Sequence, residues 1–345
     1  MTAYANIGLS DQAASAPAAR EAWIDQTRGL GIVLVVLGHL WRGLYDAGLL
    51  PQGRAFEVVD RLIYSFHMPL FFVLAGLFFE RALLRMPAQA FVRSRVIRLL
   101  YPFLLWTYLF AAFKVCAGSL ANESFRWEDM LFSPLPPRWH FWFLWALFVI
   151  EIAALGLKAL LATPQARTGV WLGTLGLLVA LYFAPIGAAA WVPLLIGALH
   201  YAPYVALGVL ISRLGLPFRG PAAIPAAVVM FVAMEWLALA GPQSSAVTLL
   251  VGSVASISVC ILASEVSRTF GSTAILSAFG YLGRISMAIY LSHTIFSAAA
   301  RIALQQAGVM DLSVHMLAGL AFGLLGPVLL FLAAQRTGTV RLLGF

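Results

Sequence analysis

Runs of about twenty apolar residues recur along almost the whole chain. A membrane-spanning helix needs about 20 consecutive, mostly apolar residues. Ten stretches reach or approach this length, at 27–46, 59–80, 96–117, 140–162, 169–184, 190–212, 222–240, 246–266, 284–306 and 312–334. The fifth stretch is short and is followed by Pro185, so the fifth and sixth spans are the least certain pair. The pattern predicts an all-α, polytopic integral membrane protein with about ten transmembrane helices.

The composition agrees with this fold class. The 345 residues are 62% hydrophobic and only 10% charged, whereas soluble domains carry roughly 25% charged residues. The two cysteines, Cys116 and Cys260, lie in apolar runs and have neither the number of a disulfide framework nor metal-ligand spacing. The sequence contains no phosphate-binding glycine loop and no metal-ligand cluster. We therefore expect no metal cofactor.

The formal net charge of +8 could indicate a polyanionic partner. Membrane proteins, however, collect Arg and Lys in their cytoplasmic loops. If both termini are cytoplasmic, fifteen of the 22 basic residues fall on the cytoplasmic side of the ten spans. We therefore predict cytoplasmic termini, a location in the cell (inner or cytoplasmic) membrane, a lipid bilayer as partner and no nucleic-acid partner.

The chain divides into one membrane domain and two short ends. Residues 1–22 lack the basic start and apolar run of a signal peptide, so they are predicted to be a disordered cytoplasmic tail. The transmembrane domain is predicted at 23–336 and a short cytoplasmic tail at 337–345. No internal repeat is evident, whereas many secondary transporters are built from inverted repeats. This is mild evidence against a transporter.

The first predicted span contains Arg28 and His39, eleven residues apart. On an α-helix this spacing places both within about 20° of one face and about 16 Å apart along the axis. Ionisable groups at membrane depth are functional candidates by default. The pair suits a cavity that is entered from the Arg28 side. The alternative is that His39 makes a polar contact between helices.

The second span carries His67 next to Pro69. This proline frees a backbone carbonyl near Ser65 and can kink the helix. Freed backbone groups in a membrane are tolerated only where they are buried in protein or line a wet cavity. His67 is therefore expected at a cavity or at a helix interface, and a purely structural kink is the alternative.

A basic cluster, Arg93, Arg95 and Arg98, stands at the start of the third span. Arg95 and Arg98 share one helix face, and the free N–H groups of a helix N-terminus attract phosphate. These arginines are candidates for binding a phosphate-rich ligand that arrives from the cytoplasm. Positive-inside anchoring is the alternative explanation.

The fourth span opens with His140, and Trp139, Trp142 and Trp145 recur there every three residues. Such tryptophans usually form an aromatic belt at the membrane interface. A sugar-stacking platform that includes Trp142 is the sharper alternative. Later in this span Glu151 needs a partner, as an intramembrane carboxylate.

The ninth span places Ser286, Tyr290 and His293 on one helix face, at i, i+4 and i+7. A polar stripe in an apolar span indicates a cavity wall or a polar contact between helices. Glu235, in the seventh span, is a second intramembrane carboxylate. Either Glu235 or Glu151 could orient a histidine or pair with an arginine.

Together these motifs resemble the membrane acyltransferase-3 family. The resemblance lies, in the family's order, in Trp23–Asp25 with Arg28 and His39, in Ser65–Phe72, in Arg95–Arg98, in Phe141–Leu144 and in Gly283–His293. It implies a ten-helix membrane enzyme that moves an acyl group, usually acetyl, from cytoplasmic acyl-CoA to a hydroxyl of a surface glycan or of its lipid-linked precursor. The sequence departs from the family at Ala75-Gly76, where many members have Ser-Gly.

The residues and the resemblance suggest one arrangement for the donor. The phosphates of acetyl-CoA, the expected acyl-donor substrate, would dock against Arg95 and Arg98 with help from Arg93. Arg28 would guide the acetyl end into the cavity.

The same hypothesis assigns the chemistry to histidines. Neutral His39 would act as general base on the acceptor hydroxyl, or would first accept the acetyl group. His67 and His293 are second candidates, for positioning the acceptor or relaying a proton. Trp142, Ser286 and Tyr290 are candidates for binding the acceptor. An exporter of a glycan or amphiphile, with His39 and Glu235 as a proton path, is the alternative function. A structural membrane partner explains neither polar helix face.

Overall fold

The computed structural model describes residues 18–51, 53–123, 125–185, 192–271 and 273–345. Over these ranges the chain forms helices, turns and bends and contains no strand. The prediction of an all-α polytopic membrane protein is confirmed. Most of the predicted tail, residues 1–17, lies outside the described residues, and the first helix begins at Ala18.

Thirteen α-helices are present in the described ranges. They are α1 (Ala18–Asp46), α2 (Arg54–Tyr64), α3 (His67–Arg85), α4 (Ala88–Arg95), α5 (Tyr101–Ala117), α6 (Trp142–Ala153), α7 (Arg167–Phe183), α8 (Val192–Leu214), α9 (Ala223–Ala240), α10 (Ser245–Phe270), α11 (Ala274–Arg284), α12 (Ser286–Gln306) and α13 (Leu312–Thr337). A π-helical turn, Val96–Leu100, joins α4 to α5, and short 3₁₀ turns lie at Gly118–Leu120, Trp127–Phe132 and Ala154–Leu157.

Seven helical stretches in the described ranges are long and apolar enough to cross a membrane. They are Arg54–Arg85, Ala88–Leu120, Val192–Leu214, Ala223–Ala240, Ser245–Phe270, Ser286–Gln306 and Leu312–Thr337. Three predicted spans correspond to α1, which is not among the seven, and to the shorter apolar helices Trp142–Leu157 and Arg167–Phe183. The chain is a multi-pass membrane protein, and the count of ten spans and the side of the termini stay predictions.

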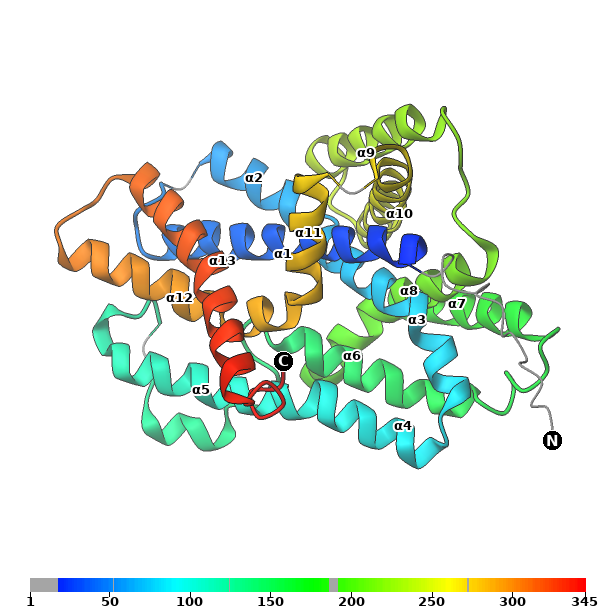
Figure 1. The fold of residues 1–345 in the computed structure, drawn as a ribbon, viewed down its shortest axis with the longest axis horizontal. Helices are drawn as coiled ribbons and strands as arrows, with labels where there is room; N and C mark the ends of the chain where they lie inside the picture. Colours follow the sequence, from blue (N-terminus) through cyan, green and yellow to red (C-terminus); the bar gives the residue numbers. More distant parts are fainter. Residues whose placement is uncertain (1–17, 52, 124, 186–191, 272) are drawn as a thin grey trace, which may run out of the picture.

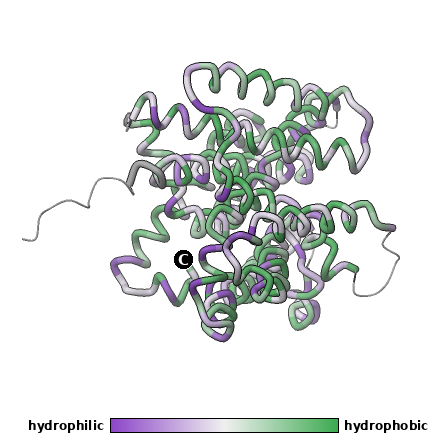
Figure 2. Tube along the Cα trace, turned by 90° about the vertical axis from the view of Figure 1, so that its right-hand side faces the viewer, coloured by the Kyte–Doolittle hydropathy of each residue, from purple (hydrophilic) through white to green (hydrophobic). Residues whose placement is uncertain are grey.

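Helix α1 runs through the middle of the molecule (Figure 1) and packs against α2, α3, α10, α11, α12 and α13. Its buried face carries Ile32, Val35, Val36, Leu40 and Leu44, none more than 4% exposed. Their spacing of one, three and four residues follows the helical repeat of a core-facing stripe. The hydropathy colouring shows green, hydrophobic residues along most of the helices, with purple, hydrophilic ones in short stretches between them (Figure 2).

The helix of the second predicted span is interrupted shortly before Pro69. Helix α2 ends at Tyr64 and α3 begins at His67, and the Leu70 N–H donates to the Phe66 carbonyl in the first turn of α3. Ser65 lies in the break and donates from Oγ to the two carboxylate oxygens of Glu235, over 2.9 and 3.1 Å. Ser65 is therefore the partner that the intramembrane Glu235 needs.

The residues after α13, predicted as a short tail, fold back onto α5. The Tyr101 hydroxyl donates to the Leu342 carbonyl over 2.6 Å, and Trp106 Nε1 donates to the Leu343 carbonyl over 2.8 Å. The Phe345 ring stacks on Trp106 with a centroid distance of 5.7 Å. Helix α5 and the chain end are thus held together by side-chain to backbone hydrogen bonds and an aromatic stack.

Helices α3 and α8 touch backbone to backbone at Gly76 and Gly208. A Cβ atom on Gly76 would lie 2.2 Å from the Val205 carbonyl oxygen, and one on Gly208 would lie 2.0 Å from the Val73 carbonyl oxygen. Small residues let transmembrane helices approach this closely and gain van der Waals contact. The pair sets the position of α8 against α3.

We predict that Gly76→Ala destabilises the protein, because the new methyl group meets rigid backbone and forces α3 and α8 apart. The expected loss is about 1–3 kcal/mol, measured as a lower melting temperature of the detergent-purified protein. Gly173→Ala in α7 is the matched control, since nothing lies within 4 Å of a Cβ atom there. Equal melting temperatures for the two variants would contradict the close contact.

Candidate active site

Three histidines from distant parts of the chain meet inside the helix bundle. His39 comes from α1, His140 from the turn before α6 and His293 from α12. The ring centroids lie 5.2 Å apart for His39 and His293, 5.4 Å for His39 and His140, and 5.0 Å for His140 and His293. His140 is 5% exposed and His293 is fully buried. We call these three residues the histidine cluster.

The backbone of α12 fixes the tautomer of His293. Its Nδ1 lies 2.9 Å from the Ile289 carbonyl oxygen and 2.8 Å from the Tyr290 carbonyl oxygen. Carbonyl oxygens only accept hydrogen bonds, so Nδ1 carries the proton and Nε2 presents a lone pair. This Nε2 is buried and has no hydrogen-bond partner among the described residues. His293 therefore has a free hydrogen-bond acceptor, its Nε2, within the histidine cluster.

His140 is held in the cluster through its backbone. The Tyr290 hydroxyl donates to the His140 carbonyl oxygen. The preceding residue, Trp139, has a φ of 52°, which is in the left-handed region that a bulky L-residue rarely adopts. Such strain persists only where the surrounding structure over-determines it, and it collects at functional sites.

Trp139 is in turn held by a polar contact outside the helices. Its Nε1 donates to Glu123 Oε2 over 3.4 Å, and Lys114 at the end of α5 also donates to this carboxylate. The Lys114 ammonium holds the pKa of Glu123 below its ordinary value. The Glu123 carboxylate thus stays ionised and accepts hydrogen bonds from both Lys114 and Trp139. The bond to Trp139 supports the strained turn that precedes His140.

His140 was not among the residues predicted to carry chemistry. The sequence shows it only as a histidine at the start of an aromatic segment, next to Trp139 and Trp142. Nothing in the spacing relates it to His39 or His293, which are more than a hundred residues away on either side. Only the packing of α6 against the other helices reveals the contact.

His67 lies outside the cluster, behind Tyr64. The ring centroids are 6.3 Å apart for His39 and Tyr64, and 4.7 Å for Tyr64 and His67. His67 Nδ1 lies 2.6 Å from the Ile63 carbonyl oxygen, so it too carries its proton on Nδ1. The Arg42 guanidinium stacks on Tyr64, 3.3 Å from the ring centroid, and binds Asp60 through two hydrogen bonds of 2.6 and 2.9 Å.

A cavity of about 590 Å³ leads from the Arg28 end of α1 toward the cluster. This volume is within the range of small-molecule sites, about 300–1,000 Å³. Its lining comes from α1, α3, α6, α11 and α12, and comprises Asp25, Arg28, Ile32, Val35, Met68, Phe71, Leu74, Ala75, Phe143, Leu147, Gly283, Arg284, Ser286, Met287 and Tyr290. Of the two alternatives for this polar face, Ser286 and Tyr290 lie on the cavity wall, and the Tyr290 hydroxyl also makes a polar contact with the His140 carbonyl.

The cavity is charged at one end, and its other end lies near the histidine cluster, whose three residues are not part of its lining. Arg28, which pairs with Asp25 over 3.4 Å, and Arg284 supply its cationic groups. Val35 and Tyr290 also line it, and these residues stand one helical turn before His39 and His293. Arg28 thus lines the cavity, whereas His39 lies one turn beyond its lining, and entry from the arginine side stays a prediction.

Trp142 does not line this cavity. Its ring packs between helices, with centroid distances of 5.0 Å to Tyr201 of α8 and 6.2 Å to Phe72 of α3. The structure thus places Trp142 in the interface of α3, α6 and α8, whereas Ser286 and Tyr290 face the cavity.

The three predicted phosphate-binding arginines also lie away from the cavity lining. Arg93 and Arg98 are exposed, on α4 and on the π-helical turn. Arg95 points inward instead, and its Nε lies 2.6 Å from Glu151 Oε2, with the two side chains only 11% and 7% exposed. Of the two alternatives for Glu151, orienting a histidine or pairing with an arginine, the structure shows the pairing with an arginine.

We predict that Glu151→Leu costs about 3–5 kcal/mol of stability, because it leaves the Arg95 charge buried without a partner. The double variant Arg95→Leu/Glu151→Leu should recover most of this loss. Melting curves of the four proteins in one detergent measure the coupling. If the two single losses simply add, the pair does not exist as a buried ion pair.

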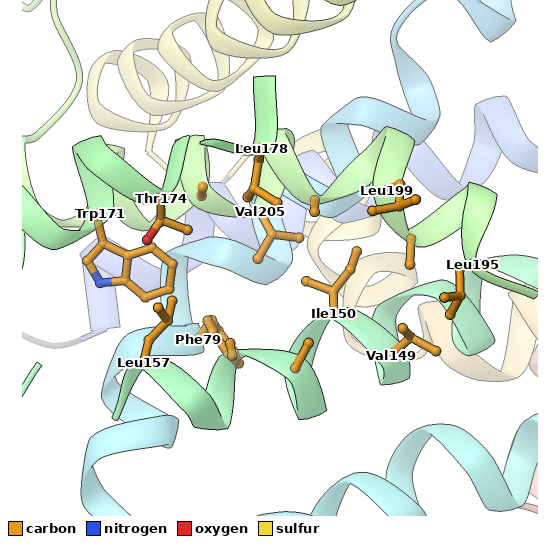
Figure 3. Close-up of a pocket in the computed structure, with 15 residues that line it drawn as sticks. Phe79, Val149, Ile150, Leu157, Trp171, Thr174, Leu178, Leu195, Leu199 and Val205 are labelled. Atoms are coloured by element: carbon orange, nitrogen blue, oxygen red, sulfur yellow. The ribbon is translucent and has the colours of Figure 1, made fainter. Parts of the chain in front are cut away.

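A second pocket, of about 340 Å³, is almost purely apolar. Side chains from α3, α6, α7 and α8 surround it, among them Phe79, Ile150, Leu178 and Leu199 (Figure 3). Thr174 is the polar side chain in its lining besides Trp171, whose Nε1 donates to Glu80 over 3.0 Å. With no charged group in its wall, this pocket lacks the means to bind and activate a polar substrate.

The described residues contain no group of three His, Cys, Asp or Glu side chains arranged to hold a metal ion, the histidine cluster included. Imidazoles can transfer protons and act as nucleophiles. A cavity with cationic groups lies beside these imidazoles.

Comparison with known proteins identifies the family of this chain. A family model described as an acyltransferase domain matches residues 21–332, so the chain belongs to the acyltransferase-3 family. The chain is therefore a multi-pass membrane protein that carries an acyltransferase domain of this family.

Two curated relatives are both described as nodulation protein NolL. That of Mesorhizobium japonicum is 30% identical over 194 residues, which cover 56% of this chain and 48% of that protein. That of Sinorhizobium fredii is 32% identical over 133 residues, covering 37% and 34% respectively. The matches thus span at most about half the length of these relatives. No solved structure matches the chain.

Proposed function

We propose that this protein transfers an acyl group, acetyl in the first instance, from acyl-CoA to a hydroxyl of a surface glycan or of its lipid-linked precursor. The observation that carries the proposal is the cavity of about 590 Å³, which joins a cationic mouth at Arg28 and Arg284 to the neighbourhood of His39. Family membership supports acyl transfer rather than export of a glycan. The choice of acetyl-CoA and of a glycan rests on the resemblance of the sequence motifs.

The donor fits the cavity by charge and by shape. The Arg28 end is the cytoplasmic end if the positive-inside rule sets the orientation, and acyl-CoA is a cytoplasmic substrate. Arg28 and Arg284 would bind the anionic or carbonyl groups of the donor. The apolar wall of Ile32, Val35 and Leu74 would take the pantetheine arm and the acyl group. The phosphate-binding role of Arg93, Arg95 and Arg98 stays a prediction.

The transfer step then needs a base within the bundle. His39 would take the proton from the acceptor hydroxyl as its oxygen attacks the thioester carbon. The carbon–sulfur bond breaks, and the proton passes to the departing thiolate of CoA. General-base catalysis of this kind contributes typically about 10²–10⁴-fold. His293 and His67 would relay the proton or position the acceptor, and the enzyme would act in the inner membrane.

We predict that His39→Ala abolishes labelling of glycan when membranes that contain the protein receive CoA with a labelled acetyl group. The reason is the loss of the base, which is expected to reduce transfer by at least about 10²-fold. Wild-type membranes with matched protein levels are the control. If correctly inserted His39→Ala transfers acetyl as fast as wild type, His39 is not the general base.

We also predict that Ala75→Phe raises the KM for acetyl-CoA by about tenfold or more, since a phenyl ring at Ala75 fills part of the cavity that would bind the donor. Ala154→Phe is the matched control, because Ala154 lines the apolar pocket on the other side of α6. Initial rates of CoA release at varied acetyl-CoA concentration give the KM. Equal effects of the two variants would mean that the donor does not use this cavity.

A further inference from the structure

We infer that the apolar pocket between α6 and α7 binds an acyl chain of an anionic membrane phospholipid, whose phosphate lies near Lys158 and Arg167. The inference does not depend on the proposed function, because it needs only a protein that lies in a bilayer. It starts from the shape of the pocket, from the chemistry of its lining and from the charges beyond one of its ends.

The pocket is a gap between two helices that share a neighbour. Helix α8 packs against both α6 and α7, but α6 and α7 are not packed against each other to a comparable extent. Ala198, Ala202 and Ala206 of α8 line the gap at intervals of one turn, so no long side chain from this face fills it. Close-packed interiors contain few voids larger than a water molecule. A gap of about 340 Å³ therefore calls for an occupant.

The lining favours hydrocarbon as this occupant. A water molecule inside a protein needs about two to four polar partners, and a wall of leucine, isoleucine, valine, alanine and phenylalanine side chains does not provide them. Leu178, Leu195 and Leu199 are only half-buried, so the pocket can be reached from the surface of the bundle. For a membrane-spanning bundle, the apolar material at that surface is the acyl chains of lipids.

The length of the pocket matches one leaflet of a bilayer. Figure 3 shows Trp171 and Leu157 at one end and Leu195 at the other. On α8 the lining runs from Leu195 to Ala206, eleven residues, which is about 16 Å at 1.5 Å per residue. Half of the hydrocarbon core is about 15 Å thick. The pocket thus suits a phospholipid acyl chain better than a chain that crosses the whole bilayer.

Two cations lie beyond the Trp171 end of the pocket. Lys158 directly follows Leu157, and Arg167 stands one helical turn before Trp171. Leu157 and Trp171 both line this end (Figure 3). Lys158 and Arg167 also lie where the chain passes from α6 into α7. Such a connection between apolar helices belongs at a membrane surface, which is where the head groups of lipids are found.

These two cations keep hydrogen-bond donors for a phosphate. Lys158 donates to the Met86 carbonyl, and Arg167 Nε donates to the Leu161 carbonyl over 2.8 Å. Within the described ranges neither of them pairs with a carboxylate. An ammonium has three N–H donors and a guanidinium has five. Each side chain can therefore hold its carbonyl and still donate to an anionic head group.

A third cation at this end is already paired. Arg213 Nε donates to Thr168 Oγ1 over 3.1 Å, next to Arg167 in the chain, and Arg213 pairs with Glu80 over 2.8 Å. Arg213 and Glu80 neutralise each other, so the end of the pocket keeps the positive charge of the other two cations. Basic pockets between transmembrane helices bind anionic lipid head groups. The charge thus selects an anionic phospholipid over a zwitterionic one.

The test measures how lipids stabilise the detergent-purified protein. Palmitoyl-oleoyl phosphatidylglycerol is the anionic probe, and phosphatidylcholine with the same chains is the zwitterionic one. The anionic lipid is expected to raise the melting temperature by about 3 °C or more, since a ligand that binds only the folded state stabilises it. Phosphatidylcholine should give a clearly smaller shift. Mass spectrometry of the protein after gel filtration should show phosphatidylglycerol retained.

One variant fills the pocket. Leu178→Trp places a larger side chain in the gap and should lose most of the shift caused by phosphatidylglycerol. Leu177→Trp is the matched control, because Leu177 is the neighbouring residue of α7, does not line the pocket and is 60% exposed. It should keep the wild-type shift.

A second variant tests the head group without filling the gap. Lys158→Gln/Arg167→Gln keeps a donor for each backbone carbonyl but removes both charges, and it should abolish the preference for phosphatidylglycerol over phosphatidylcholine. Arg336→Gln/Arg341→Gln removes the same charge from two exposed arginines at the end of α13 and beyond it. This control should keep the preference.

The remaining outcomes would overturn the inference. Equal shifts with the two lipids in the wild-type protein would mean that the head group is not recognised. A wild-type response in Leu178→Trp would mean that the lipid binds elsewhere. A larger shift with a polyprenyl phosphate would assign the pocket to a glycan carrier, and loss of a dimer in Leu178→Trp would assign it to a second copy of the chain. None of these results would alter the proposed acyl transfer.

Discussion

The close crossing of α1 and α11 governs the arrangement of the site. A Cβ atom on Gly29 would lie 1.9 Å from the Phe279 carbonyl oxygen, and one on Gly283 would lie 1.8 Å from the Asp25 carbonyl oxygen. The two backbones can approach this closely only because both residues are glycine. Since α12 begins directly after α11, this contact sets its register against α1. Arg28, Ile32 and Val35 of α1 and Ser286, Met287 and Tyr290 of α12 thereby line one cavity.

The bilayer imposes the second constraint, because a polar group without a partner is costly in hydrocarbon. The structure meets it by pairing intramembrane charges across distant segments, as in Arg95 with Glu151 and Ser65 with Glu235. Glu80 receives hydrogen bonds from Arg213 and Trp171 in the same way. The Nε2 atoms of His140 and His293 are among the buried side-chain atoms that have no hydrogen-bond partner in the described part of the chain.

The two pockets differ in the chemistry of the residues that line them. Both share walls from α3 and α6. The cavity with Arg28, Arg284 and Tyr290 offers charge, a hydroxyl and access toward imidazoles, whereas the pocket with Phe79 and Ile150 offers only hydrocarbon contact. The functional argument therefore rests on the polar cavity.

The sequence by itself determined the class of fold, because runs of about 20 apolar residues in a chain with 10% charge have no stable place in water. It also determined two polar faces, Arg28 with His39 and Ser286 with Tyr290 and His293, because helical periodicity is a local property. It could not show that Arg95 turns inward to Glu151, that Trp142 is a packing residue or that His140 joins His39. Those facts depend on how helices cross, and crossings follow from close contacts between residues far apart in the chain. Tertiary structure alone decided them.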